Sequence, residues 1–221
     1  DWLTFRSTPR PSYLVPRMLY RNGLSVIFGE PGSGKSYLIL DIALSLATAR
    51  SWQGHRLTGR DNGPGMVHYV MAEGRDINLV RAEAWEHYHD VSPEAVQGHF
   101  RVIGAGVLLT EPGIRNYLAL VRKDQPDLIV LDTRNALSTA KESAGDEYGA
   151  MLRVLNTLRE AAHALGCAVV LIDHSGLGDK GRARGSNAQQ AGVHTEIVVT
   201  KPGDGAAGIY TARVTRNKAA G

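Results

Sequence analysis

The sequence has a single cysteine among its 221 residues, so it cannot form a disulfide within the chain. Cys167 opens the apolar run 167–172, where we expect it to be a small buried hydrophobic residue. A chain without disulfides is typical of a reducing compartment, and we therefore expect a cytoplasmic protein.

Long apolar runs are also absent. No stretch approaches the roughly 18 consecutive apolar residues that a membrane-spanning helix needs, and no signal peptide is visible. We therefore expect no membrane among the partners of this protein. The first residue is Asp1 rather than Met, which leads us to expect a piece of a longer chain.

The chain has little excess of either charge, but its basic residues are unevenly distributed. The net charge is +3, and hydrophobic residues make up 43% of the chain, as in ordinary globular proteins. Residues 175–221 carry seven Lys or Arg and three Asp or Glu, so the basic charge is concentrated there. This distribution is compatible with a polyanionic partner and equally with a solvated surface.

Apolar runs and apolar residues spaced three and four apart alternate along the chain. This alternation predicts an α/β fold with a mostly parallel central sheet, helices on both faces, and two antiparallel strands at the C-terminal end. Residues 1–22 are rich in Pro and Arg and are expected to be an irregular lead-in or linker. Predicted strands cover 24–28, 66–72, 100–104, 128–131, 168–172, 195–200 and 208–215, and predicted helices cover 35–49, 76–89, 114–123 and 146–165.

A glycine-rich loop, "GEPGSGKS", joins the first predicted strand to the first long helix. Its pattern is that of a P-loop, in which backbone N–H groups and a helix N-terminus hold phosphates. Lys35 is expected to neutralise the β- and γ-phosphates of ATP, and the Ser36 hydroxyl to bind Mg²⁺. The predicted nucleotide-binding residues of this segment are Gly29, Glu30, Pro31, Gly32, Ser33, Gly34, Lys35, Ser36 and Tyr37.

Two carboxylates end predicted strands. Asp132 closes the buried strand of "LIVLDT", where ligands bind in open α/β sheets, and is expected to hold Mg²⁺ through water. An acid often follows such an aspartate, but here the next residue is Thr133. Glu73, which ends the strand of "VHYVMAEG", is therefore the candidate to orient the attacking water. The alternatives are a capping acid for Asp132 and an ordinary exposed glutamate for Glu73.

These segments, together with "VVLIDHSG" and the following "RGSNAQQAG", resemble the core of the RecA-like ATPases. The sequence is most similar to the RepA-type hexameric replicative helicases of phages and plasmids. The resemblance covers roughly residues 20–218 and implies one RecA-like ATPase domain over 23–218.

The resemblance implies roles for individual residues. Glu73 would be the catalytic base, Asp132 the Mg²⁺-linked acid, and His174 the residue that senses the γ-phosphate. RepA-type sequences often have two adjacent histidines at this point, whereas this chain has Asp173 and His174. A loop histidine bonded to nearby backbone is the alternative for His174.

The loop over 175–187 corresponds to the segment that grips single-stranded DNA in RecA-like motors. Its glycines give it freedom, and Lys180, Arg182 and Arg184 supply alternating cations for a phosphate backbone. No aromatic residue lies in this loop, so stacking on bases is not indicated. A solvated loop is the alternative.

Arg216 and Lys218 lie two residues apart in the segment 213–218, which continues the last predicted strand, and there they would share one face. In ring-shaped relatives a basic pair near this point reaches the γ-phosphate of the neighbouring subunit. The family order is commonly Lys then Arg, the reverse of the order here. Charges that protect an edge strand are the alternative.

The leading hypothesis is an Mg²⁺-dependent ATPase motor that assembles with itself as a ring, expected to be hexameric, and acts on single-stranded DNA as a replicative helicase. A RecA-like recombinase or recombination mediator would use the same ATP site. An ATP-controlled binding module without motor activity is a third hypothesis.

Overall fold

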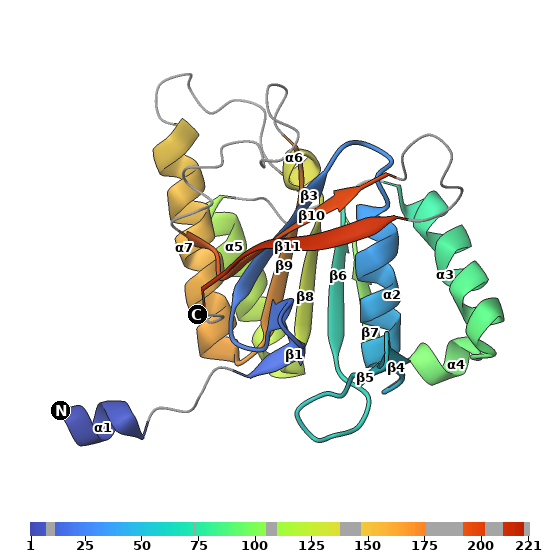
Figure 1. Ribbon diagram of the computed structural model, residues 1–221, viewed down its shortest axis with the longest axis horizontal. Coiled ribbons are helices and arrows are strands. Elements are labelled where there is room, and N and C mark those ends of the chain that lie inside the picture. The colour runs from blue at the N-terminus through green and yellow to red at the C-terminus, as the bar shows by residue number, and fades with distance from the viewer. Residues whose placement is uncertain are drawn as a thin grey trace.

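A seven-stranded sheet forms the centre of the structure, with the strand order β11-β10-β3-β9-β8-β6-β7 (Figure 1). This computed structural model describes residues 1–7, 12–72, 74–104, 110–137, 147–175, 192–201 and 210–218. The strands are β3 (Leu24–Gly29), β6 (Val67–Met71), β7 (Phe100–Ile103), β8 (Leu128–Asp132), β9 (Ala168–His174), β10 (Thr195–Thr200) and β11 (Thr211–Asn217).

All neighbouring strands from β10 to β7 are parallel, and only β11 runs antiparallel, against β10. Every residue of β3, β6 and β8 is buried, as continuous apolar runs in a sheet covered on both faces require. The predicted mostly parallel sheet with a final antiparallel pair is therefore confirmed.

Helices cover both faces of the sheet, as the sequence predicts (Figure 1). The helices α2 (Lys35–Ala47) and α3 (Arg75–His89) pack on one face, and α5 (Glu111–Val121) and α7 (Glu147–Leu165) pack on the other. Each pair forms its own hydrophobic cluster with the strand residues that face it. The short elements are α4 (Pro93–Val96), the 3₁₀ helix η1 (Arg122–Asp124) and α6 (Arg134–Leu137).

The strand β9 lies between β3, which leads into the P-loop, and β8, which ends in Asp132. Its register pairs His174 with Gly29, and Ser175 donates its backbone N–H to the Gly29 carbonyl at 3.2 Å. Because the strands are parallel, the P-loop, Asp132 and His174 meet at one edge of the sheet.

Residues 1–22 contain regular structure rather than being irregular throughout. A short helix, α1 (Trp2–Arg6), lies away from the sheet, and β1 (Tyr13–Val15) pairs with β2 (Leu19–Tyr20) (Figure 1). This hairpin packs on the domain through buried Leu and Val side chains, and the Tyr20 hydroxyl donates to Asn217 Oδ1 at 2.6 Å. Strands of two or three residues are too short to show a period in the sequence.

A second small hairpin, β4 (Ser51–Trp52) with β5 (His55–Arg56), follows α2. It is held by Asp41 of α2, whose two carboxylate oxygens accept from the indole N–H groups of Trp52 and Trp85, each at 2.7 Å. One carboxylate thus joins α2, β4 and α3.

Cys167 is fully buried, and burial raises the pKa of its thiol to about 12, as for an unreactive core residue. Among the helices of the described ranges, none has the length and apolar character needed to cross a bilayer.

Candidate nucleotide-binding site

The P-loop runs from the end of β3 to the start of α2. Its backbone turns through left-handed conformations at Gly32 (φ 70°) and Gly34 (φ 91°), which favour glycine. Gly34 is the N-cap of α2, so the positive end of the helix dipole faces the loop. A Cβ at Gly34 would stand 3.1 Å from the ring of Tyr210, so close packing also requires glycine here.

Lys35 is buried inside the loop, with 5% of its surface exposed. Its ammonium donates to the carbonyl oxygens of Gly29 at 3.0 Å and Glu30 at 2.9 Å. Burial lowers the pKa of Lys35, while the nearby carboxylates of Asp132 and Asp173 act in the opposite direction. The lysine is therefore a buried cation surrounded by acceptors and acids.

A pocket of about 230 Å³ lies over this loop. Two buried polar atoms at the pocket, Ser33 Oγ and Arg81 Nε, have no hydrogen-bond partner among the residues described. Unsatisfied donors on residues that line a cavity fit an anionic ligand. The lining residues are Pro31, Gly32, Ser33, Gly34, Lys35, Ser36, Tyr37, Arg81, Thr133, His174 and Tyr210.

A larger pocket of about 760 Å³ adjoins the first and shares Gly34, Tyr37, Arg81 and Tyr210 with it. The guanidinium carbon of Arg81 lies 4.2 Å from the centre of the Tyr37 ring, in cation–π geometry. Flat aromatic and guanidinium groups line the passage between the phosphate-sized pocket and the larger one. The combined cavity thus offers donors for phosphates at one end and planar surfaces at the other.

Asp132 is the acid of the site. It is 5% exposed, and its Oδ2 accepts the hydroxyl hydrogen of Tyr69 at 2.8 Å. Burial, and then the charge of Asp132, hold the pKa of Tyr69 well above its ordinary value, so the phenol remains a donor. The peptide bond between Asp132 and Thr133 is cis.

The donor set fits Mg²⁺ in the company of a nucleotide. The Ser36 hydroxyl and the Asp132 carboxylate are hard oxygen donors at the same edge of the sheet. No group of three or more His, Cys, Asp and Glu that could hold a metal occurs among the described residues. Mg²⁺ in nucleotide sites commonly takes one or two protein oxygens, and phosphate and water complete its shell.

His174 lines the smaller pocket, where the resemblance places the γ-phosphate sensor. Its backbone N–H donates to Oδ1 of Asp173 at 2.8 Å, and the same oxygen accepts from Arg134 Nε at 2.9 Å.

Four predicted site residues lie outside the described part of the chain. They are Glu73, Lys180, Arg182 and Arg184. The backbone N–H of Ala72, just before Glu73, donates to the carbonyl of Asp132 at 3.0 Å, so the last described residue of this segment adjoins the acid.

Arg216 and Lys218 lie at the opposite edge of the sheet from the P-loop of their own chain. Lys218 follows the end of β11 and donates its backbone N–H to His194, which in turn donates to Leu24 at the start of β3. Arg216 faces Glu196 in the β10–β11 register. Partial burial, and then the charge of Arg216, lower the pKa of Lys218. Neither basic residue lines its own nucleotide pocket.

The structure adds residues that the sequence reasoning missed. Tyr69 and Met71 are two residues apart on β6, so their side chains point to the same face of the sheet. Met71 is in register with Asp132, and the Tyr69 hydroxyl donates to the Asp132 carboxylate. The alternation of side-chain direction along a strand could therefore have indicated Tyr69. Arg81 and Tyr210 carry no local motif. Arg81 lies on α3 and Tyr210 immediately precedes β11, and only the fold brings them to the P-loop.

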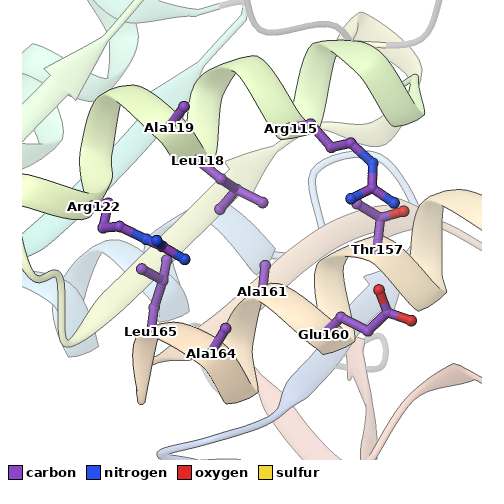
Figure 2. Close-up of a pocket in the computed structure, with 9 residues that line it drawn as sticks. All are labelled: Arg115, Leu118, Ala119, Arg122, Thr157, Glu160, Ala161, Ala164 and Leu165. Carbon is purple, nitrogen blue, oxygen red and sulfur yellow. The ribbon is translucent and has the colours of Figure 1, made fainter.

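A further pocket, of about 580 Å³, lies on the other face of the sheet between α5 and α7 (Figure 2). Figure 2 shows Arg115 and Arg122 extending from the α5–η1 segment toward α7, above an alanine- and leucine-rich floor. Arg115 is paired with Glu111 at 2.9 Å. No P-loop residue lines this pocket, so it is separate from the nucleotide site.

Comparison with known proteins identifies the family. The family model described as an AAA domain matches residues 1–180, which include the P-loop, Asp132 and His174. No curated protein matches the chain significantly. The match covers well over half of the chain and agrees with the geometry of the P-loop edge. The protein therefore belongs to the AAA domain family of P-loop ATPases.

Proposed function

We propose that the protein is an Mg²⁺-dependent ATP-hydrolysing motor core, a ring-forming DNA helicase of RepA type that acts in replication. One observation carries the ATPase part of this proposal. The buried Lys35 ammonium lies inside a glycine loop, next to two carboxylates and beneath a pocket with unpartnered donors.

ATP fits the combined cavity in one orientation. The triphosphate takes the pocket over the P-loop, where Lys35, Ser33 and Arg81 supply cations and donors. The base then lies in the larger pocket, against the planar groups of Tyr37 and Tyr210. The reverse orientation would place three phosphates in a pocket that is lined largely by aromatic and aliphatic side chains and includes the Asp41 carboxylate.

Ser36 and Asp132 would hold Mg²⁺, Ser36 directly and Asp132 through water. When bound, Mg²⁺ neutralises charge that develops on the β- and γ-phosphate oxygens. The hydroxyl of Tyr69 keeps the Asp132 carboxylate oriented toward this edge of the sheet.

Hydrolysis proceeds by in-line attack of a water oxygen on the γ-phosphorus. The bond to the bridging oxygen of ADP breaks, and Glu73 accepts a proton from the water. Lys35 stabilises the charge on the phosphate oxygens, and His174 contacts the γ-phosphate. Arg216 and Lys218 lie far from their own P-loop, which supports a role at the pocket of a neighbouring subunit.

Single-stranded DNA is the proposed substrate on which the motor moves. The support is the sequence pattern of Lys180, Arg182 and Arg184 and the resemblance to the DNA-gripping loop of RecA-like motors. The described end of β9 leads from His174 directly into this segment, so the nucleotide edge and the basic segment are consecutive in the chain.

Action on single-stranded DNA is tested by measuring the ATPase rate with and without this DNA, and by measuring DNA affinity at several salt concentrations. We expect DNA to stimulate turnover, and Arg184→Ala to weaken DNA binding without lowering the basal rate. Arg213→Ala, at an exposed arginine of β11, is the matched control. Absence of both stimulation and salt-dependent binding would favour the nucleotide-controlled binding module.

The assembly is tested by measuring particle size with and without nucleotide, followed by electron microscopy with ATP and single-stranded DNA. A closed ring supports the helicase. Helical filaments would instead support the RecA-like recombinase, because that function needs an open assembly on DNA.

A further inference from the structure

A buried ion pair adjoins residues that line the pocket over the P-loop. Arg134 Nε and Asp173 Oδ1 are 2.9 Å apart, and their side chains are 11% and 0% exposed. Removing two charges from water is costly unless they are well paired, so a pair this deeply buried constrains the groups around it. The pair joins the start of α6 to the end of β9.

Each member of the pair is the chain neighbour of a residue that lines the pocket. Arg134 follows Thr133, and Asp173 precedes His174; both neighbours face the cavity over the P-loop. The oxygen that accepts from Arg134 also accepts the backbone N–H of His174, at 2.8 Å. One buried oxygen therefore fixes Arg134 and the backbone of His174 together.

The end of β9 is held from the other side by the P-loop strand. His174 is in register with Gly29, and Ser175 donates to the carbonyl of Gly29 at 3.2 Å. The backbone of His174 thus stands between two fixed points, the first residue of the P-loop and the Arg134–Asp173 pair.

We propose that Arg134 and Asp173 are positioning residues that hold His174 at the phosphate end of the pocket. This inference rests on the proposed ATPase function and concerns how the same site places a group against the γ-phosphate. The pair sets the position of His174 during turnover, and neither of its side chains lines the pocket over the P-loop. We therefore expect Arg134 to contribute little to nucleotide affinity.

The main test is Arg134→Met, assayed for kcat and KM of ATP hydrolysis, with nucleotide stoichiometry measured in parallel so that kcat refers to folded molecules. We expect kcat to fall about 10-fold or more, since small displacements of a positioned group cost rate. KM should stay within about threefold, as for a group that acts mainly in the transition state. Arg134→Lys, which keeps the charge, should recover most of the lost kcat.

The matched control is Arg60→Met. Arg60 Nε lies 3.4 Å from Oδ1 of Asp127. Asp127 is a buried acid that directly precedes β8, at the end of that strand away from Asp132. This variant also leaves a buried carboxylate without its arginine, but far from the pocket. It should lower thermal stability and leave kcat unchanged.

Should Arg134→Met fail to fold, Asp173→Asn is the second variant. Its amide oxygen can still accept from His174 but no longer carries the charge that pairs with Arg134, so kcat should fall severalfold. KM is not the criterion for this variant, because the charge of Asp173 also acts on Lys35. Wild-type kcat in a fully nucleotide-binding Arg134→Met or Asp173→Asn protein overturns the inference, as does an equal loss in Arg60→Met. Lack of ATP hydrolysis by the wild-type protein is a different result, which overturns the proposed function itself.

Discussion

Lys35 illustrates how a buried cation is kept ready for a ligand. Its ammonium already donates to two carbonyl oxygens of the loop, so the charge is satisfied before any phosphate arrives. A triphosphate would exchange these neutral acceptors for charged ones, and such hydrogen bonds are roughly twice as strong. The loop therefore keeps the lysine aimed at the pocket without holding an unpaired charge.

The proposed role of Glu73 in activating water can be tested by one substitution. We expect Glu73→Gln to retain ATP binding and to lower kcat at least about 100-fold, because the amide cannot accept the proton of the attacking water. The measurement is ATP affinity at equilibrium beside the steady-state rate. Retained turnover would show that another group orients the water.

The larger pocket, where the base of ATP is proposed to lie, gives a second prediction at the residue scale. Tyr37→Ala should weaken ATP binding about 10-fold, the order expected for loss of one ring that stacks on a base. Binding of inorganic tripolyphosphate should change much less, because it has no base. Tyr37→Phe keeps the ring and serves as the control. Equal losses for ATP and tripolyphosphate would mean that Tyr37 acts on the phosphates instead.

At the scale of elements, α2 connects the phosphate site to the rest of its layer. It begins at the P-loop, and one turn beyond Tyr37 it carries Asp41, which holds both indoles. The helix that presents the phosphate-binding N–H groups is therefore fixed against β4 and α3 by hydrogen bonds to a charged acceptor.

We expect Asp41→Ala to lower the free energy of unfolding by about 2–4 kcal/mol, because two indole donors lose a charged acceptor. Urea unfolding followed by circular dichroism measures this change. Asp61→Ala, at an exposed aspartate of a nearby loop, should lie within about 0.5 kcal/mol of the wild type. Equal stabilities of the two variants would contradict the role of Asp41.

The sequence predicts long elements and fails for short ones. The P-loop, the strand that ends in Asp132 and the four long helices follow from periodicity and a motif of fixed spacing, and each is present. The hairpins β1–β2 and β4–β5 have too few residues for a period to emerge. Arg81, Arg134 and Tyr210 join the site through tertiary packing alone, and no pattern near them in the chain indicates it.

At the scale of the whole molecule, the two ends of the parallel strands differ: the candidate nucleotide site lies at one edge of the sheet, and a group of polar contacts lies toward the opposite edge. The P-loop, Asp132 and His174 share the first edge. Toward the other edge, buried His68 of β6 lies 3.2 Å from Asp124, which also pairs with Arg101 at 3.1 Å. Polar contacts near this second edge join β6, η1 and β7, and so they contribute to the stability of the domain.

This arrangement predicts a stability that depends on pH. Burial lowers the pKa of His68 below its ordinary value of 6.5, and Asp124 opposes this shift only in part. The unfolded chain then takes up a proton more readily than the folded one, so the free energy of unfolding decreases as the pH falls below 6.5 toward the folded-state pKa.

We therefore expect the Tm to fall between about pH 7.5 and pH 5.5, and His68→Gln to reduce that fall. Some dependence should remain, because burial also lowers the pKa of His194. His55→Gln, at an exposed histidine, is the control and should leave the pH profile unchanged. A His68→Gln profile identical to that of the wild type would exclude His68 as the source.

The hydrogen bonds of Asp41 to two tryptophans have a consequence for the fluorescence of the protein. The chain has three tryptophans, and two of them, Trp52 and Trp85, donate to this one carboxylate, while Trp2 is 67% exposed on α1. Asp41 and Trp85 also line the larger nucleotide pocket. Replacing Trp2 by Phe leaves an intrinsic fluorophore pair beside the proposed position of the base. We therefore expect the emission of the protein itself to follow nucleotide binding and release in real time, without an attached dye.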